Sequence, residues 1–199
     1  MTDTTITLAL VILFSVPMIY HSYRLRGAKR TLILLLNIVG IAVIVELIGV
    51  TSGAYTYTGQ TLVLVTIFVG IGWIANTYPA MHISLYLLNL YNNKRIKPQE
   101  ALVVAILSGC FGVIYDLFMD PVAVALGTWV WAKEGPWYGV PLSNFIGWFL
   151  IIFSIVFGYT LVDNKNASIP KKALLSIISI VLGSALVYLA MKICAYIGI

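Results

Sequence analysis

The sequence has few charged residues and few cysteines, and both shortages narrow the class of protein. Only 10% of its 199 residues are charged, whereas 61% are hydrophobic and the mean hydropathy is +1.00. This composition lies outside soluble globular usage and is typical of proteins that cross a membrane several times. Cys110 and Cys194 lie in apolar segments without a CxxC spacing or a nearby histidine, which argues against a disulfide or a metal site.

Spacings typical of nucleotide, zinc or haem sites are also missing, which argues against nucleotide, redox and metal chemistry. The basic residues fall in short loops between apolar stretches, so the net charge of +5 does not indicate a nucleic-acid partner. No stretch remains for a soluble domain. We therefore predict one transmembrane domain over residues 1–199.

Long apolar stretches dominate what is present. Because about 20 apolar residues cross the hydrocarbon core, the sequence predicts an all-α membrane bundle of about six transmembrane helices. The predicted spans are Thr5–Tyr23, Thr31–Val50, Thr61–Leu90, Glu100–Met119, Leu142–Val162 and Ala173–Ile197. The third is long for one crossing, and Pro79 near its middle predicts a kink or a break.

Basic residues follow the first, third and fifth spans. They are Arg24, Arg26, Lys29, Arg30, Lys94, Arg95, Lys97, Lys165, Lys171 and Lys172. The positive-inside rule places these loops in the cytoplasm, so we expect an integral protein of the cell membrane with both termini outside. The first stretch lacks a preceding basic residue and a cleavage site, and we expect it to be a retained helix.

Three acids interrupt this apolar pattern. Glu46, Asp116 and Asp120 lie inside or at the outer ends of predicted spans. At the centre of a membrane-spanning helix, an ionised carboxylate costs about 2.5–3.5 kcal/mol. Asp116 and Asp120 are four residues apart and share a helix face, so a shared proton, a cation or donors from another helix must offset their repulsion. Pro121 suggests that the helix ends or bends at Asp120. Structural alternatives are a helix end near water for Asp120 and a hydrogen bond to a Tyr or Asn for Asp116.

Aromatic residues cluster around these acids in the sequence. They are Tyr55, Tyr57, Trp73, Tyr78, Trp129, Trp131, Trp137, Tyr138 and Trp148. One interpretation is the aromatic belt at a membrane interface. The other is a cavity for a carbocation, because a desolvated aromatic face stabilises positive charge by about 2 kcal/mol or more. Acids, rings and an apolar cavity together suit protonation of an alkene.

Two motif clusters resemble those of the carotenoid hydratase family of membrane proteins, which includes bisanhydrobacterioruberin hydratases and carotenoid 1',2'-hydratases. The larger cluster comprises Asp116-x-x-x-Asp120-Pro121, Trp129-x-Trp131, Tyr138-Gly139-Val140-Pro141 and Asn144-x-x-Gly147-Trp148. The smaller is Glu46-x-x-Gly49-x-x-Ser52-Gly53-x-Tyr55-x-Tyr57.

The resemblance implies a hydro-lyase that needs no cofactor and adds water to the terminal isopropylidene C=C of a carotenoid or other isoprenoid. Partners would be the polyene, water and the bilayer, and oligomeric state is left open. From the residues we predict Asp116 or Glu46 as proton donor and Asp120 as the group that orients water, without a firm assignment within the trio. Predicted substrate-binding residues are Tyr55, Tyr57, Trp73, Tyr78, Trp129, Trp131, Tyr138, Asn144 and Trp148, with Asn144 holding the water.

Other functions fit parts of the sequence. A membrane carotenoid cyclase or another isoprenoid-modifying enzyme would use the same protonation step. An intramembrane prenyltransferase would need a second Asp-rich motif, which the chain lacks. A small proton-coupled transporter also uses intramembrane acids, but the two halves of this sequence show no repeat. A purely structural subunit would leave the acids unexplained.

Overall fold

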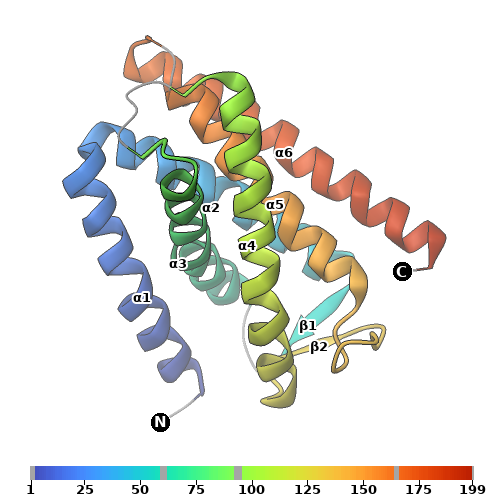
Figure 1. Ribbon diagram of the computed structural model, residues 1–199. Coiled ribbons are helices and arrows are strands. Elements are labelled where there is room, and N and C mark those ends of the chain that lie inside the picture. The colour runs from blue at the N-terminus through green and yellow to red at the C-terminus, as the bar shows by residue number, and fades with distance from the viewer. Residues whose placement is uncertain (1–2, 59–61, 92–95, 164–165, 199) are drawn as a thin grey trace.

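A bundle of helices with one small sheet makes up the described part of the chain (Figure 1). The computed structural model describes residues 3–58, 62–91, 96–163 and 166–198. The elements are α1 (Asp3–Arg26), α2 (Ala28–Thr51), β1 (Tyr55–Tyr57), α3 (Leu62–Leu87), α4 (Pro98–Ala125), β2 (Trp129–Trp131), α5 (Leu142–Asp163) and α6 (Ile169–Ile197). Within these residues α2, α4, α5 and α6 are each long and apolar enough to cross a membrane. The prediction of an all-α membrane bundle is confirmed.

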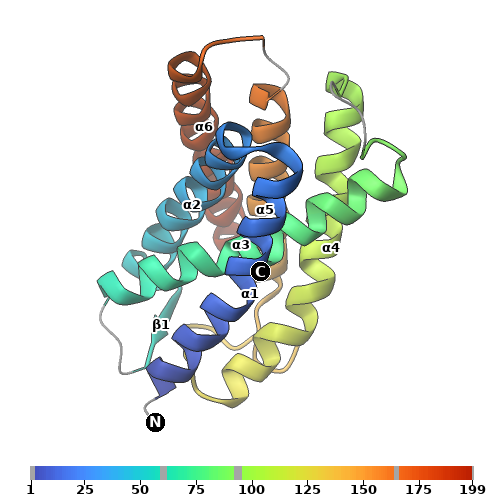
Figure 2. The ribbon, with the colours of Figure 1, turned by 90° about the vertical axis from the view of Figure 1, so that its left-hand side faces the viewer.

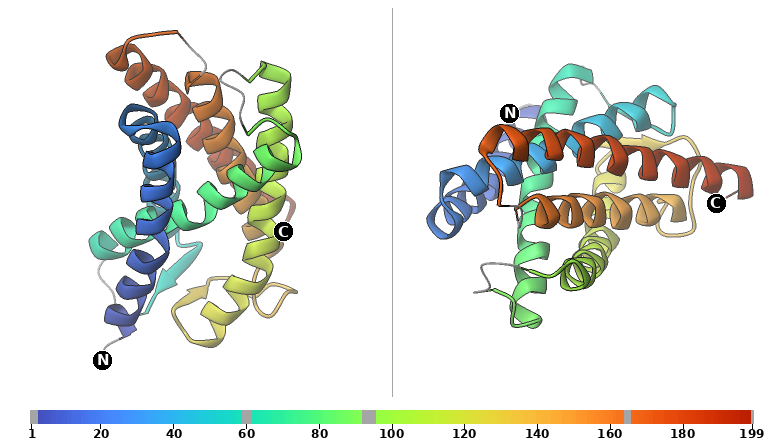
Figure 3. Two further views of the ribbon diagram at one scale, coloured as in Figure 1. Left: turned by 60° about the vertical axis from the view of Figure 1, so that its left-hand side comes forward. Right: turned by 90° about the horizontal axis from the view of Figure 1, so that it is seen from above.

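Helix α5 lies at the centre of the bundle. It packs against α4 and α6, and α2 packs against α6 and α3. Helix α3 is seen nearly end-on in Figure 1 and from the side after the 90° turn of Figure 2, so it crosses the bundle steeply. Helix α1 lies at the edge, where it packs on α3 and α2 (Figure 3). This arrangement leaves α1, α3 and α4 around one side of the molecule.

Most of the described basic residues gather at one end of the bundle, and Lys133 and Lys192 lie elsewhere. The last turns of α1, α3 and α5 and the first turns of α2, α4 and α6 lie at the top in Figure 1, and the sheet lies at the opposite end. These helix ends carry the basic residues Arg26, Arg30, Lys97 and Lys172. Lys94, Arg95 and Lys165 lie outside the described residues. That the basic end faces the cytoplasm stays a prediction.

At two prolines the helices continue where the sequence suggested that they could break or end. Helix α3 runs without interruption through Pro79, so the predicted break there is absent. Helix α4 likewise continues past Asp120 and Pro121 to Ala125, so it does not end where the sequence suggested. Proline lacks the N–H that would bond to the carbonyl four residues earlier, here that of Leu117. The indole Nε1 of Trp137 donates to this carbonyl at 2.9 Å, which replaces the missing helical hydrogen bond.

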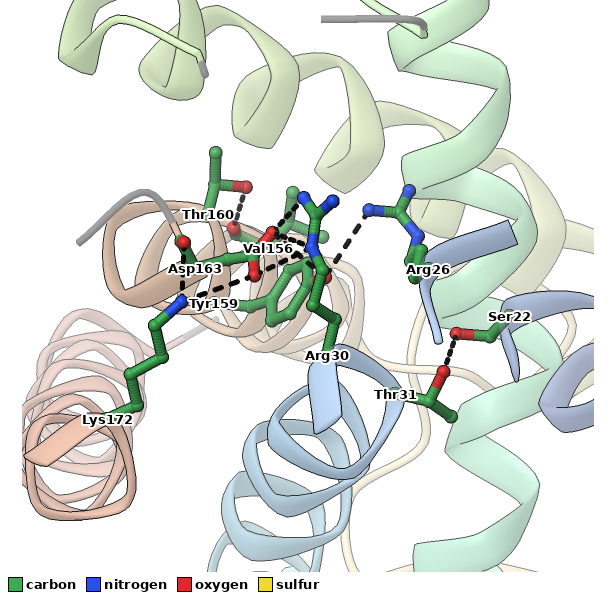
Figure 4. A network of polar contacts seen from close by, with 9 residues as sticks. All are labelled: Ser22, Arg26, Arg30, Thr31, Val156, Tyr159, Thr160, Asp163 and Lys172. Atoms are coloured by element: carbon green, nitrogen blue, oxygen red, sulfur yellow. Dashed lines mark hydrogen bonds and ion pairs between the residues drawn. The ribbon is translucent and has the colours of Figure 1, made fainter. Parts of the chain in front are cut away.

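At the basic end, Asp163 of α5 joins three helices (Figure 4). Its carboxylate forms an ion pair with Arg30 of α2, whose Nε lies 2.9 Å from both carboxylate oxygens. Lys172 of α6 donates to the Asp163 carbonyl at 2.8 Å, and Arg26 of α1 donates to Tyr159 Oη at 3.3 Å. These contacts tie the helix ends together at the end of the bundle away from the sheet.

We expect Asp163→Ala to lower the free energy of unfolding by about 2 kcal/mol. This loss of stability lies between those measured for exposed and for fully buried ion pairs, because the Arg30 side chain is 40% exposed and that of Asp163 only 6%. Thermal unfolding of the purified protein in detergent measures the change. Lys29→Ala removes an exposed charge beside Arg30 and is the matched control. Equal midpoints for the two variants would contradict the prediction.

Candidate active site

Two aspartates of α4 and one asparagine of α5 form a buried polar cluster. Asp116 and Asp120 lie one helical turn apart and are 0% and 2% exposed. Asn144, in the first turn of α5, donates from Nδ2 to Oδ2 of each aspartate at 2.6 Å. The four-residue spacing therefore turns both carboxyl groups toward α5, as the sequence predicts. Both amide hydrogens of Asn144 are engaged by the two carboxyl groups, so the residue positions the acids; that it also holds water stays a prediction.

Glu46 of α2 is held by a different kind of donor. Tyr57 Oη donates to Glu46 Oε1 at 2.6 Å, and the Tyr55 hydroxyl also interacts with this carboxyl group. Burial raises the pKa of Tyr55 and of Tyr57 well above the ordinary value, and the neighbouring Glu46 charge adds to the shift. Both phenols therefore stay protonated at physiological pH, so that Tyr57 can donate to Glu46.

The small sheet brings four aromatic side chains onto one face. Strands β1 and β2 are antiparallel, with Tyr55 opposite Trp131 and Tyr57 opposite Trp129. Alternate residues of a strand point to the same face, so these four rings form a continuous surface, which we call the aromatic wall. Ring centroids are 5.0 Å apart for the first pair and 5.8 Å for the second. Val130, between the two tryptophans, is 56% exposed on the other face.

A cavity of about 1020 Å³ lies against the aromatic wall. Glu46, Asp120 and Asn144 line it together with the four rings of the wall. Trp73 of α3 and Trp148 of α5 also line it, and their rings are tilted by 34° at a centroid distance of 4.2 Å. Asp116 does not line the cavity and lies behind Asp120. The structure thus gathers most of the predicted residues around one space, with Asp116 behind its surface.

Two predicted substrate-binding residues lie elsewhere. The Tyr78 hydroxyl is 2.9 Å from His21 Nδ1 and its ring stacks on His82, away from the cavity. Tyr138 is 74% exposed and has a φ of 51°, in the short turn that follows Trp137. Neither side chain lines the cavity, so we leave both out of the candidate site.

The structure also adds residues that the sequence prediction missed. Lining residues include Asn76 of α3, Tyr115 of α4 and Met191 of α6. Asn76 is a polar residue within an apolar run, a signal that could have singled it out. No comparable signal marks Met191. Trp137 supports the site indirectly, because its bond to Leu117 holds the turn of α4 that carries Asp120.

This arrangement suits acid–base chemistry on an apolar molecule. Two close carboxyl groups with one shared amide donor favour holding one proton between them. The buried Nε1 atoms of Trp129 and Trp131 have no hydrogen-bond partner among the described residues. Among those residues no group of three His, Cys, Asp or Glu could hold a metal ion.

Comparison with known proteins gives one match. The model of the family described as "Carotenoid biosynthesis protein" matches residues 6–199. Neither the curated proteins nor the solved structures yield a match.

Proposed function

The chain belongs to the carotenoid biosynthesis protein family, and from this premise we propose that it adds water to the terminal isopropylidene C=C of an acyclic carotenoid or related isoprenoid. The product would be a tertiary alcohol. The observation that carries the proposal is the placement of Asp120 and Glu46 on one apolar cavity beside the aromatic wall. The two acids have different partners, so they suit opposite roles in proton transfer.

The aspartate pair is the proposed proton donor. Asp120 lines the cavity, and Asp116 lies behind it with the same Asn144 donor. Two buried anions at this distance are costly, and one proton shared between them removes that cost. Asp120 transfers this proton to the less substituted alkene carbon and becomes a carboxylate. This assignment replaces the direct donor role predicted for Asp116.

The tertiary carbocation that results would be stabilised by aromatic faces. The rings of the aromatic wall, with Trp73 and Trp148, border the cavity in which the positive charge forms. Such rings attract a desolvated cation by about 2 kcal/mol or more. They also keep bulk water away from the cation, so that capture is left to a single positioned water.

Glu46 is the proposed base. Its carboxyl group accepts a hydrogen bond from Tyr57 Oη, and this donor partly offsets the cost that burial imposes on the carboxylate. A water near Glu46 adds its oxygen to the cation and gives one proton to Glu46. The proton returns from Glu46 to the aspartate pair before the next turnover, so the net change is one water added to one alkene.

The test is expression of the chain in cells that make lycopene or bisanhydrobacterioruberin, followed by mass spectrometry of the pigments. We expect the mass of one water to be gained at each modified end. A new ring-type absorption spectrum with unchanged mass would identify a cyclase instead. No change with either polyene, from folded and membrane-inserted protein, would refute action on these carotenoids and would favour a transporter.

A further inference from the structure

The lining of the cavity includes two groups of exposed residues that differ in chemistry, and we take each group to mark an opening. On one side its lining includes exposed side chains from α1 and α4, Phe14 at 55% and Tyr115 at 48%. Gly72 and Ala75 of α3 lie between these helices and also line the cavity. We call this opening the apolar mouth and define it by Phe14, Gly72, Ala75 and Tyr115. Helix α3 runs between α1 and α4 in Figure 1, so the mouth follows the crossing helix.

The other opening carries charge. Lys133 and Glu134, which follow β2, line it together with Lys192 of α6, and all three are exposed. Bringing an apolar chain past these groups would remove water from them without a compensating contact. This side therefore suits the entry of water.

We propose that the hydrocarbon chain of the substrate enters from the lipid through the apolar mouth and lies along α3. The inference rests on the proposed function, because it concerns where the long unreacted part of the proposed substrate binds. Small residues at 72 and 75 leave room for a chain to pass. A Cβ built on Gly72 would meet only Val11 Cγ2, at 3.7 Å, which is ordinary contact.

The route leads from the mouth to the acids. Tyr115 immediately precedes Asp116, and its ring centroid is 6.0 Å from that of Trp148. The Trp148 ring packs against that of Trp73, one residue beyond Gly72 on α3. A linear polyene lying along this path would pass the two indoles and present its end to Asp120. The substrate class that fits is a long acyclic isoprenoid without a polar group in the segment next to the reacting end.

Thiol labelling of Gly72→Cys tests the path, in a background where Cys110 and Cys194 are replaced by alanine. A benzyl methanethiosulfonate reagent attaches a bulky group at the mouth, and dithiothreitol removes it. In proteoliposomes we expect the label to lower lycopene hydration about tenfold or more, with full recovery after reduction. Val16→Cys is the matched control, because Val16 is 54% exposed on α1 and does not line the cavity.

Protection from labelling gives a readout that does not depend on hydration. Excess lycopene should slow the labelling of the Gly72→Cys variant several-fold and leave the labelling rate of the Val16→Cys variant unchanged. Protection without any hydration would support the path and refute the proposed function. Hydration that is unaffected by the label, or an absence of protection at 72, would overturn the path.

Discussion

Asp120→Asn is expected to lower the rate of water addition by about 10²–10⁴-fold, the range that a positioned general acid contributes. The amide keeps the shape of the side chain and can still bond to Asn144, but it has no acidic proton to give to the alkene. Pigment analysis over a time course in the expressing cells measures the rate. Asp116→Asn should cost less, because Asp116 does not reach the cavity and acts through Asp120.

The matched control for this variant is Glu100→Gln on the same helix. Glu100 caps the first turn of α4, where it accepts from the Lys97 backbone N–H at 2.7 Å, far along the helix from the acid pair. Its loss should leave the rate of hydration unchanged. If Asp120→Asn retained the full rate while remaining folded, Asp120 could not be the proton donor.

Gly49→Ala should abolish most of the activity while leaving the helix stable. Gly49 lies one turn after Glu46, and a Cβ there would be 2.6 Å from both Cε1 and Oη of Tyr55. The ring must therefore move, and it cannot do so freely because it also contacts Tyr57 and Trp131. We expect activity to fall about 10²-fold, because displacing a positioned group by about 1 Å lowers the rate by about that factor.

Gly40→Ala on the same helix provides the comparison. A Cβ at Gly40 would be 2.6 Å from Ile180 Cδ1, so the crowding is equal, but that atom ends a flexible side chain remote from the cavity. Pigment analysis with a thermal unfolding midpoint for each variant separates activity from stability. Similar activity in the two variants would show that the position of Tyr55 does not matter for catalysis.

Helical periodicity predicted much of the bundle and part of the site. The spacing of Asp116 and Asp120 was enough to place both on one face, because i and i+4 coincide on a helix. The same geometry explains the misplacement of Tyr78. It is five residues from Trp73, or about 140° around the helix, and its side chain contacts His21 and His82 instead of the cavity. The prediction grouped Trp73 and Tyr78 around an expected break at Pro79 that α3 does not have.

The sheet escaped prediction because each strand has only three residues and its partner is far away in the chain. A short strand has no hydrophobic alternation long enough to recognise. The signal was nevertheless present, since both strands read aromatic-x-aromatic, the spacing that places two rings on one face. Contacts such as that of Trp137 with Leu117 depend on tertiary packing and leave no pattern in the sequence.

The two-stranded sheet also has a consequence for where the bilayer ends. In the described residues each strand pairs along one edge only, so N–H and C=O groups on the outer edges need other partners. Hydrocarbon cannot supply them, and an open sheet edge is not tolerated in contact with lipid tails. We therefore expect the headgroup region to reach the level of Thr56 and Val130. Glu46 and Asp120 then lie just beneath this hydrated layer, at a depth where single water molecules can reach them and lipid tails begin.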